Sequence, residues 1–264
     1  MIHFIPAPYK QIDGCSNVFI NNMKIIQGRP RIWRYVFDYD VEQPKLDPVP
    51  IKLKSSEGLS LFRYMNESHF LSDLNAQQLT FISPKLWNDP FERLFYADGG
   101  VVIGNAKYYI RCICLTYDWI ESEEAAWNRG LGGNAMVRVE YDFQKLCDVL
   151  ESQSKNYDFY FSVIDYSLPR RDIIQLSKLY PVNSLQDYLN LLSLKRKAFV
   201  YENEIRLFMV SNSPIPQDVI SINYSNQPIS SVCLPPQQTE LTRVETTANI
   251  NRINVIHSRL YDVE

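Results

Sequence analysis

The chain has 264 residues and a formal net charge of −3 at pH 7, and hydrophobic residues make up 45% of it. This length and composition indicate one large packed domain, or one domain with an appendage, and argue against a disordered chain. The negative charge argues against broad electrostatic binding to nucleic acid, although it leaves room for a local basic groove. Neither a signal peptide nor a run of ~20 apolar residues is found, so we expect a cytoplasmic protein that does not contact a membrane.

The first 55 residues differ from the rest because prolines interrupt them repeatedly. Short apolar runs at 18–26 and 32–37 are the candidate strands of this stretch, and residues 44–50 are typical of a linker. We therefore interpret residues 1–55 as an N-terminal appendage with short strands, packed on a main domain that covers residues 56–264.

The main domain begins with a strand pattern at 59–64 and a helix pattern at 67–77. Further strands are expected at 79–82, 108–117, 135–141, 157–166, 204–210, 219–224 and 252–256. Further helices are expected at 121–128, at 142–152 with Asp142 as its cap, and from Ser184 through Ala198. Because strands and helices alternate without a regular βαβ period, we expect an α+β fold with a mixed, mostly antiparallel sheet core and flanking helices.

The most distinctive stretch is 82–92, where a strand ends at Ser83 and two prolines stiffen the turn that follows. The turn presents three polar side chains, Asn88, Asp89 and Glu92. A rigid polar loop at a strand edge is a usual place for binding residues. The alternative is an Asx-turn and helix cap, with Trp87 and Phe91 as core anchors.

A second stretch, 195–206, contains a Glu-x-Glu-x-Arg pattern. If a strand begins at Glu202, then Glu202, Glu204 and Arg206 share one face. Two such carboxylates repel, which raises one pKa unless a cation lies between them, and Arg206 is the candidate cation. The pattern is either a solvated ion-pair row or a site that holds a ribose hydroxyl and an acceptor group. Arg63, on the first strand of the main domain, needs a partner such as one of these glutamates or a bound phosphate, or else reaches the surface.

Cysteine, histidine and basic residues indicate no further site. Five cysteines without a Cys-x-x-Cys pair, and only three histidines, predict buried free thiols and no metal site. No serine lies in a nucleophile elbow. The two short basic runs, 195–197 and Arg170-Arg171, are typical of solvated faces.

Over roughly residues 59–261, the chain resembles the bacterial domain of unknown function 2971 family. The resemblance rests on Arg63-Tyr64, Ile82-Ser83-Pro84, Asn88-Asp89-Pro90-Phe91-Glu92, Trp127 before a glycine, Glu202-Asn203-Glu204-Ile205-Arg206 and Ser258-Arg259-Leu260-Tyr261. One departure is Gly130, which stands where the family tends to carry an aromatic residue. The family itself implies no activity.

The order of the motifs is similar, more remotely, to the Arg-Ser-Glu arrangement of ADP-ribosyltransferases. This similarity implies that Arg63 holds the phosphates of NAD and that Ser83 steadies the site. It also implies that Glu204 stabilises the oxocarbenium-like transition state, with Glu202 near the acceptor. The remaining candidate cofactor-binding residues are Tyr64, Asn88, Asp89, Trp127 and Arg206. The spacing departs from the usual pattern, because Arg63 and Ser83 are close in sequence and Ser83 lacks a Ser-Thr-Ser context.

Three functions are open from the sequence. The similarity to ADP-ribosyltransferases implies an NAD-using ADP-ribosyltransferase-like or NAD-glycohydrolase-like effector, such as a bacterial toxin or an antiviral (phage) defence protein with a protein partner. The first alternative is a non-catalytic binding or regulatory subunit of a protein assembly, in which the Glu-x-Glu-x-Arg residues form a structural ion-pair row. A weaker alternative is a metal-dependent nucleic-acid-processing enzyme that uses Asp89 and Glu92, although no acidic-lysine nuclease pattern is present.

Overall fold

The computed structural model describes residues 9–12, 15–21, 60–116, 127, 136–166, 168–236 and 242–258. The expected strand at 32–37 and the linker at 44–50 lie outside these residues, as does the expected helix at 121–128 except for Trp127. Of the closing motif at 258–261, only Ser258 is described.

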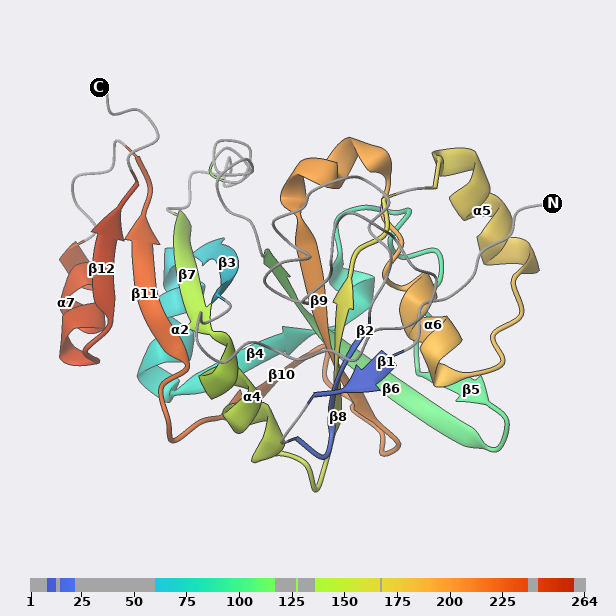
Figure 1. Cartoon of the computed structure of the whole chain (residues 1–264), viewed down its shortest axis with the longest axis horizontal. Coiled ribbons are helices and arrows are strands. Elements are labelled where there is room, and N and C mark those ends of the chain that lie inside the picture. Colours follow the sequence, from blue (N-terminus) through green and yellow to red (C-terminus); the bar gives the residue numbers. More distant parts are fainter. Residues whose placement is uncertain are drawn as a thin grey trace, which may run out of the picture.

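A large mixed sheet forms the centre of the protein (Figure 1). The strands of the described residues are β1 (Tyr9–Gln11), β2 (Val18–Asn21), β3 (Ser60–Asn66), β4 (Gln78–Ile82), β5 (Val101–Ile103), β6 (Ala106–Thr116), β7 (Met136–Asp142), β8 (Asp158–Val163), β9 (Glu204–Ser211), β10 (Val219–Asn223), β11 (Ile229–Leu234) and β12 (Asn254–His257). The main path of the sheet runs β1-β2-β8-β9-β6-β3-β7-β11-β12, and β4, β5 and β10 attach beside β6. Among the described strands, β2 with β8 and β11 with β12 pair in parallel, and the other pairs are antiparallel.

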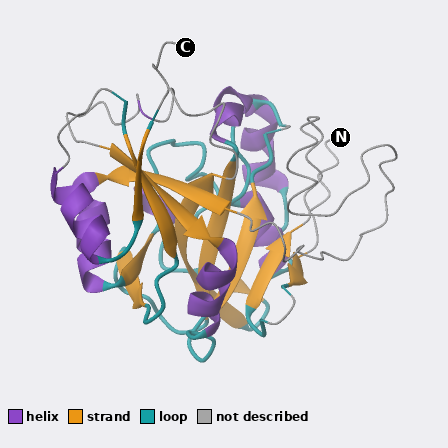
Figure 2. Cartoon of the chain, turned by 60° about the vertical axis from the view of Figure 1, so that its left-hand side comes forward, coloured by secondary structure: helices purple, strands orange, loops and turns teal. Residues whose placement is uncertain are grey.

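Helices surround the strands (Figure 2). They are α2 (Glu67–Ala76), α4 (Phe143–Glu151), α5 (Arg170–Leu179), α6 (Leu185–Leu191) and α7 (Thr242–Ile250), with the 3-10 helices η1 (Pro84–Leu86) and η2 (Lys197–Glu202). The predicted α+β class, with a mostly antiparallel sheet and flanking helices, is confirmed. Within the described part of the chain, no helix is long and apolar enough to cross a membrane.

The N-terminal caps predicted at Asp142 and Ser184 are present, but the helix predicted to start at Ser184 is shorter than expected. The Asp142 side chain accepts a hydrogen bond from the Lys145 backbone N at 3.0 Å, and α4 follows it as expected. Ser184 starts α6 with a capping box, yet the helix ends at Leu191 and does not continue through Ala198. The chain leaves the helix because Leu194 forms a bridge with Asp165 beside the end of β8, and the Lys195 backbone N donates to the Asp165 carbonyl.

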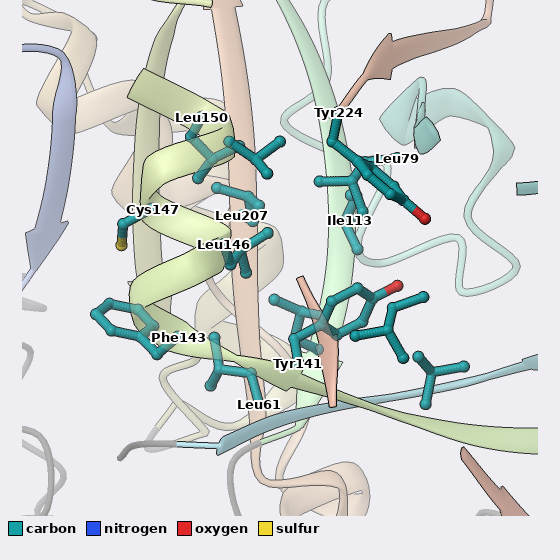
Figure 3. Close-up of a cluster of buried hydrophobic side chains, with 14 of the residues drawn as sticks. Leu61, Leu79, Ile113, Tyr141, Phe143, Leu146, Cys147, Leu150, Leu207 and Tyr224 are labelled. Carbon is teal, nitrogen blue, oxygen red and sulfur yellow. The ribbon is translucent and has the colours of Figure 1, made fainter. Parts of the chain in front are cut away.

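The larger hydrophobic core lies on one face of the sheet. Figure 3 shows Leu146 and Leu150 of α4 directed toward Leu207 of β9, with Phe143 and Leu61 below them. These residues are all buried, so α4 covers this face of the sheet. Residues of α2 and α7 belong to the same cluster.

A second, smaller core covers the opposite face, where α6 packs on β9 and β6. Tyr188 and Leu189 of α6 cluster there with Phe208 of β9, and Trp87 joins them from the loop after η1. Because side chains alternate along a strand, Glu204 and Arg206 share the face of Phe208. Every residue of β9 is buried, which places two charged side chains inside the protein.

Part of the N-terminal stretch belongs to the sheet. β2 pairs in parallel with β8, and β1 pairs with β2 at the edge. The carboxylate of Glu151, the last residue of α4, accepts hydrogen bonds from the Ser16 hydroxyl at 2.5 Å and from the Ser16 backbone N at 3.0 Å. The described residues of this stretch therefore pack directly on the main domain.

Candidate functional site

The two stretches that stand out in the sequence, 82–92 and 195–206, lie against each other. The loop that follows η1 brings Glu92 back to the start of β9, where it contacts both Lys195 and Arg206. We call the resulting group of five charged side chains the buried ion cluster; its members are Glu92, Lys195, Glu202, Glu204 and Arg206.

Four members of the buried ion cluster form a closed ring of charges. Lys195 Nζ lies 2.7 Å from Glu204 Oε2 and 2.9 Å from Glu92 Oε1. Arg206 completes the ring, since its Nε donates to Glu204 Oε1 at 2.7 Å and its Nη2 donates to Glu92 Oε2 at 2.9 Å. Glu202 joins from outside the ring, with its Oε2 2.6 Å from Lys195 Nζ. Each carboxylate oxygen of Glu92 and Glu204 therefore has a cationic partner.

Arg206 is the most enclosed member of the cluster, with 0% of its surface exposed. Its guanidinium carbon lies 4.0 Å from the centroid of the Trp87 ring, a cation–π contact. Its Nη1 donates to the carbonyl oxygen of Leu192, which is the C-terminal cap residue of α6. The prediction that Trp87 is a core anchor is confirmed, and part of its role is to cover this guanidinium.

The charges of the cluster stabilise one another. Burial raises the pKa of Glu204, but the charges of Arg206 and Lys195 and their hydrogen bonds outweigh it, so the pKa lies below its ordinary value. Burial lowers the pKa of Lys195, but the surrounding carboxylates, Glu204 above all, raise it overall. With all five side chains ionised, the cluster carries a formal net charge of −1, from three carboxylates and two cations.

The strand begins at Glu204, as predicted, and not at Glu202, so the condition under which Glu202 would share a strand face with Glu204 and Arg206 is not met. Glu202 ends η2, and Asn203 then takes a left-handed conformation with φ 44° before β9 starts at Glu204. The Thr116 hydroxyl donates to the carbonyl oxygens of Glu202 and Asn203 and holds this turn. Because the chain turns at Asn203, the Glu202 carboxylate still reaches the cation that binds Glu204.

The cation between the two glutamates is Lys195. The expected cation was Arg206, which pairs with Glu204, whereas Lys195 pairs with both glutamates. The expectation that residues 195–197 lie on a solvated face is wrong for Lys195, which is 7% exposed. A signal for its role was available in the sequence. The two distinctive stretches contain four carboxylates, which need more than one cation if they are buried, and the basic run at 195–197 is the nearest source.

The loop at 82–92 forms the predicted Asx-turn. The Asp89 Oδ1 accepts a hydrogen bond from the Phe91 backbone N at 3.0 Å. Its Oδ2 accepts from Arg196 Nε and Nη2 at 3.0 and 2.9 Å, so Asp89 also fixes a side chain of the second stretch. Ser83 is fully buried and caps η1. Its hydroxyl donates to the Tyr96 hydroxyl at 2.9 Å. Asn88, the third polar residue of the loop, is exposed.

Arg63 lies on the opposite face of the sheet from Glu204. Phe62 pairs with Thr116, which in turn pairs with Glu204, so these three share one face. Arg63 is the next residue and points the other way, where its Nη1 lies 3.9 Å from Asp73 Oδ2. The expectation that a glutamate of the Glu-x-Glu pair is its partner is therefore wrong.

Ser83 is also distant from Glu204. Ile82, at the end of β4, pairs with Cys112, whereas Glu204 pairs with Thr116, four residues further along β6. At the rise of a strand, that offset corresponds to about 13 Å. The structure thus does not bring together Arg63, Ser83 and Glu204.

Two of the candidate cofactor-binding residues contact each other instead. The rings of Tyr64 and Trp127 meet edge to face, with centroids 5.1 Å apart, and Trp127 is buried. Tyr64 belongs to β3, which is separated from β9 by β6 in the sheet. This aromatic pair is therefore two strands away from the start of β9.

A comparison with protein-family models and a comparison with curated proteins each found no match. The similarities to the domain of unknown function 2971 family and to ADP-ribosyltransferases therefore stay predictions from the sequence. Within the described residues, no group of three His, Cys, Asp or Glu side chains is placed to hold a metal ion. Asp89 and Glu92, the residues named for a metal-dependent enzyme, are each bound by basic side chains.

We expect Glu204→Gln to weaken the acid dependence of stability. Because the folded pKa of Glu204 lies below its ordinary value of 4.5, the stability it contributes is present above that pH and is lost as the pH falls through the folded pKa. The free energy of unfolding, measured with urea between about pH 6 and pH 3, should therefore fall less in the variant than in the wild type. Glu140→Gln controls for the loss of a carboxylate outside the cluster. Identical pH slopes in Glu204→Gln and the wild type would contradict this expectation.

Proposed function

We propose that the protein is a non-catalytic binding or regulatory subunit of a protein assembly. The observation that supports this most directly is the state of Glu204, which is 3% exposed and has both carboxylate oxygens bound by cations. A carboxylate that acts on a substrate needs an oxygen within reach of that substrate. Both oxygens of Glu204 are used inside the fold, which supports a structural role for the Glu-x-Glu-x-Arg pattern.

The buried ion cluster connects the loop after η1 to three successive elements of the 195–206 stretch. Glu92 comes from the loop after η1, Lys195 from the turn after α6, Glu202 from η2, and Glu204 with Arg206 from β9. A fully paired ring holds these segments in one arrangement, because each departure would leave a buried charge without a partner. The surface next to the ring is thereby pre-organised, which is what a binding site on loops requires.

The competing proposal is an NAD-using ADP-ribosyltransferase-like or NAD-glycohydrolase-like protein. It requires Arg63, Ser83 and Glu204 to act on one molecule of NAD. Arg63 faces the other side of the sheet and is paired with Asp73. Ser83 follows Ile82, which pairs with β6 about 13 Å along that strand from the residue that pairs with Glu204. These positions weigh against a shared site, so we rank this proposal second.

An NAD-turnover assay separates the two proposals. We expect the purified protein to release no nicotinamide from NAD, alone or with candidate partner proteins and nucleic acid. Glu204→Gln should then change stability only, and Glu140→Gln is the matched control for a Glu→Gln change elsewhere in the sheet. Nicotinamide release by the wild type that a folded Glu204→Gln variant abolishes would overturn our proposal in favour of the transferase.

The apparent mass of the native protein tests whether it belongs to an assembly. The monomer has a mass of 30.9 kDa. A subunit of an assembly should elute from size-exclusion chromatography of a native cell extract at a distinctly larger mass. Elution of all the protein at the monomer mass would count against this part of the proposal.

A further inference from the structure

Two arginine side chains from different segments lie against the same ring, directly outside the buried ion cluster. The guanidinium carbon of Arg170 is 4.6 Å from the centroid of the Phe91 ring, and that of Arg196 is 4.8 Å from it. The two carbons are therefore at most about 9.4 Å apart, the sum of those distances. Arg196 also lies 4.8 Å from the centroid of the Phe199 ring. We call this group the basic-aromatic patch; its members are Phe91, Arg170, Arg196 and Phe199.

Buried neighbours fix the patch in place. Phe91 precedes Glu92 in the chain and Arg196 follows Lys195, so each is attached to a member of the charged ring. Arg196 is held further by Asp89, which accepts two of its hydrogen bonds. Phe91 and the Arg196 guanidinium are therefore held in a defined arrangement before any ligand arrives, which reduces the entropy lost on binding.

The fold does little to stabilise the positive charge of Arg170 in this position. The residue is exposed, and among the described residues it has no acidic partner, its contact being the Phe91 ring. It is the first residue of α5, where the positive end of the helix dipole disfavours a cation. It also lies close to the like charge of Arg196. A bound anion would relieve this excess of positive charge.

The geometry points to a phosphate-bearing small ligand as the occupant. A guanidinium that stacks on a ring can still donate from its edge, and a pair of these N–H groups matches two oxygens of a phosphate. Arg196 uses Nε and Nη2 on Asp89, which leaves its Nη1 as a donor for a ligand. The two guanidinium carbons are at most about 9.4 Å apart, which is close enough for the two phosphates of one diphosphate to contact both groups. We propose that the basic-aromatic patch binds the diphosphate of such a ligand, either free pyrophosphate or a nucleoside diphosphate. This rests on the proposed function, since it names what the binding protein recognises.

Calorimetric titration of the full chain with pyrophosphate tests the proposal. We expect the wild type to bind pyrophosphate and Arg170→Ala to bind it at least about tenfold more weakly, because a bidentate ionic contact is lost. Arg171→Ala is the matched control, since it removes the same charge from the next residue, whose side chain is 82% exposed and paired with Asp172. We expect its affinity to remain within about twofold of the wild type. Both substitutions are on the surface, and thermal melting confirms that each variant is folded.

Titration with ADP identifies the source of the diphosphate. Tighter binding of ADP than of pyrophosphate, with the same loss in Arg170→Ala, supports a nucleoside diphosphate. Equal or weaker binding of ADP, again dependent on Arg170, supports free pyrophosphate. Equal affinities of Arg170→Ala and Arg171→Ala, or no binding by the wild type in the millimolar range, would overturn the proposal. Nicotinamide release is measured separately, so the proposed function and this site can each fail without the other.

Discussion

Arg206→Met should lower the free energy of unfolding by about 3–5 kcal/mol, as expected when one partner of a buried ion pair is removed. Methionine keeps most of the side-chain volume beneath Trp87, so the charge is the main loss. Glu92 Oε2 and Glu204 Oε1 lose their cation, and the formal charge of the cluster falls from −1 to −2. The Leu192 carbonyl also loses its donor.

Urea denaturation followed by circular dichroism measures this effect. Arg171→Met is the control, because its exposed charge should contribute less than about 0.5 kcal/mol. The double variant Arg206→Met with Glu204→Gln should be more stable than the sum of the two single effects, since it removes an unpaired carboxylate together with its cation. A loss below about 1 kcal/mol in Arg206→Met would show that the ring is not important for stability.

Lys195→Met should have an effect of the same size, about 3–5 kcal/mol, with a different pH dependence. Three carboxylates, those of Glu92, Glu202 and Glu204, share the Lys195 ammonium group. Without it, repulsion and burial should raise the pKa of at least one of these carboxylates above its unfolded value. The folded variant then binds more protons than the unfolded chain, so its stability should increase as the pH falls toward about 5.

The comparison for this variant is Lys85→Met. Lys85 pairs with Asp218 at 2.7 Å, but its side chain is 37% exposed, so the loss of stability should be much smaller than in Lys195→Met. Both variants are measured by urea denaturation at several pH values. If Lys195→Met is no less stable than Lys85→Met, or loses stability on mild acidification as the wild type does, the ring does not depend on this cation.

The sequence predicts the elements with a clear local signal. β4 and β10 alternate, β9 contains a continuous apolar run, and α4 has an Asp142 cap and apolar residues at helical spacing, so each is found close to its expected range. β11 and α7 were missed, because the former contains two serines and the latter carries few apolar residues. The sequence does not indicate α5, because the two arginines at its start, Arg170-Arg171, are typical of a solvated face.

The candidate site was predicted in parts but not as a whole. Both distinctive stretches contribute to it, yet Glu92 and Arg206 are separated by 114 positions, and no local pattern indicates such a contact. The predicted pairing of Arg63 with the Glu-x-Glu residues is wrong for a different reason. The strand of Arg63 was predicted correctly, but a difference of one residue moves a side chain to the other face of a sheet, and the sequence does not indicate which face receives Glu204.

The separation of Glu92 and Arg206 also bears on how the protein folds. A contact across 114 positions closes a long loop, and the ring in addition needs β9, η2 and the turn after α6 to be in place. We therefore expect the ring to form after the main sheet has assembled, on the native side of the rate-limiting barrier. Interactions formed at that stage slow unfolding and leave the rate of folding almost unchanged. The ring would then act chiefly as a kinetic lock that extends the lifetime of the folded state.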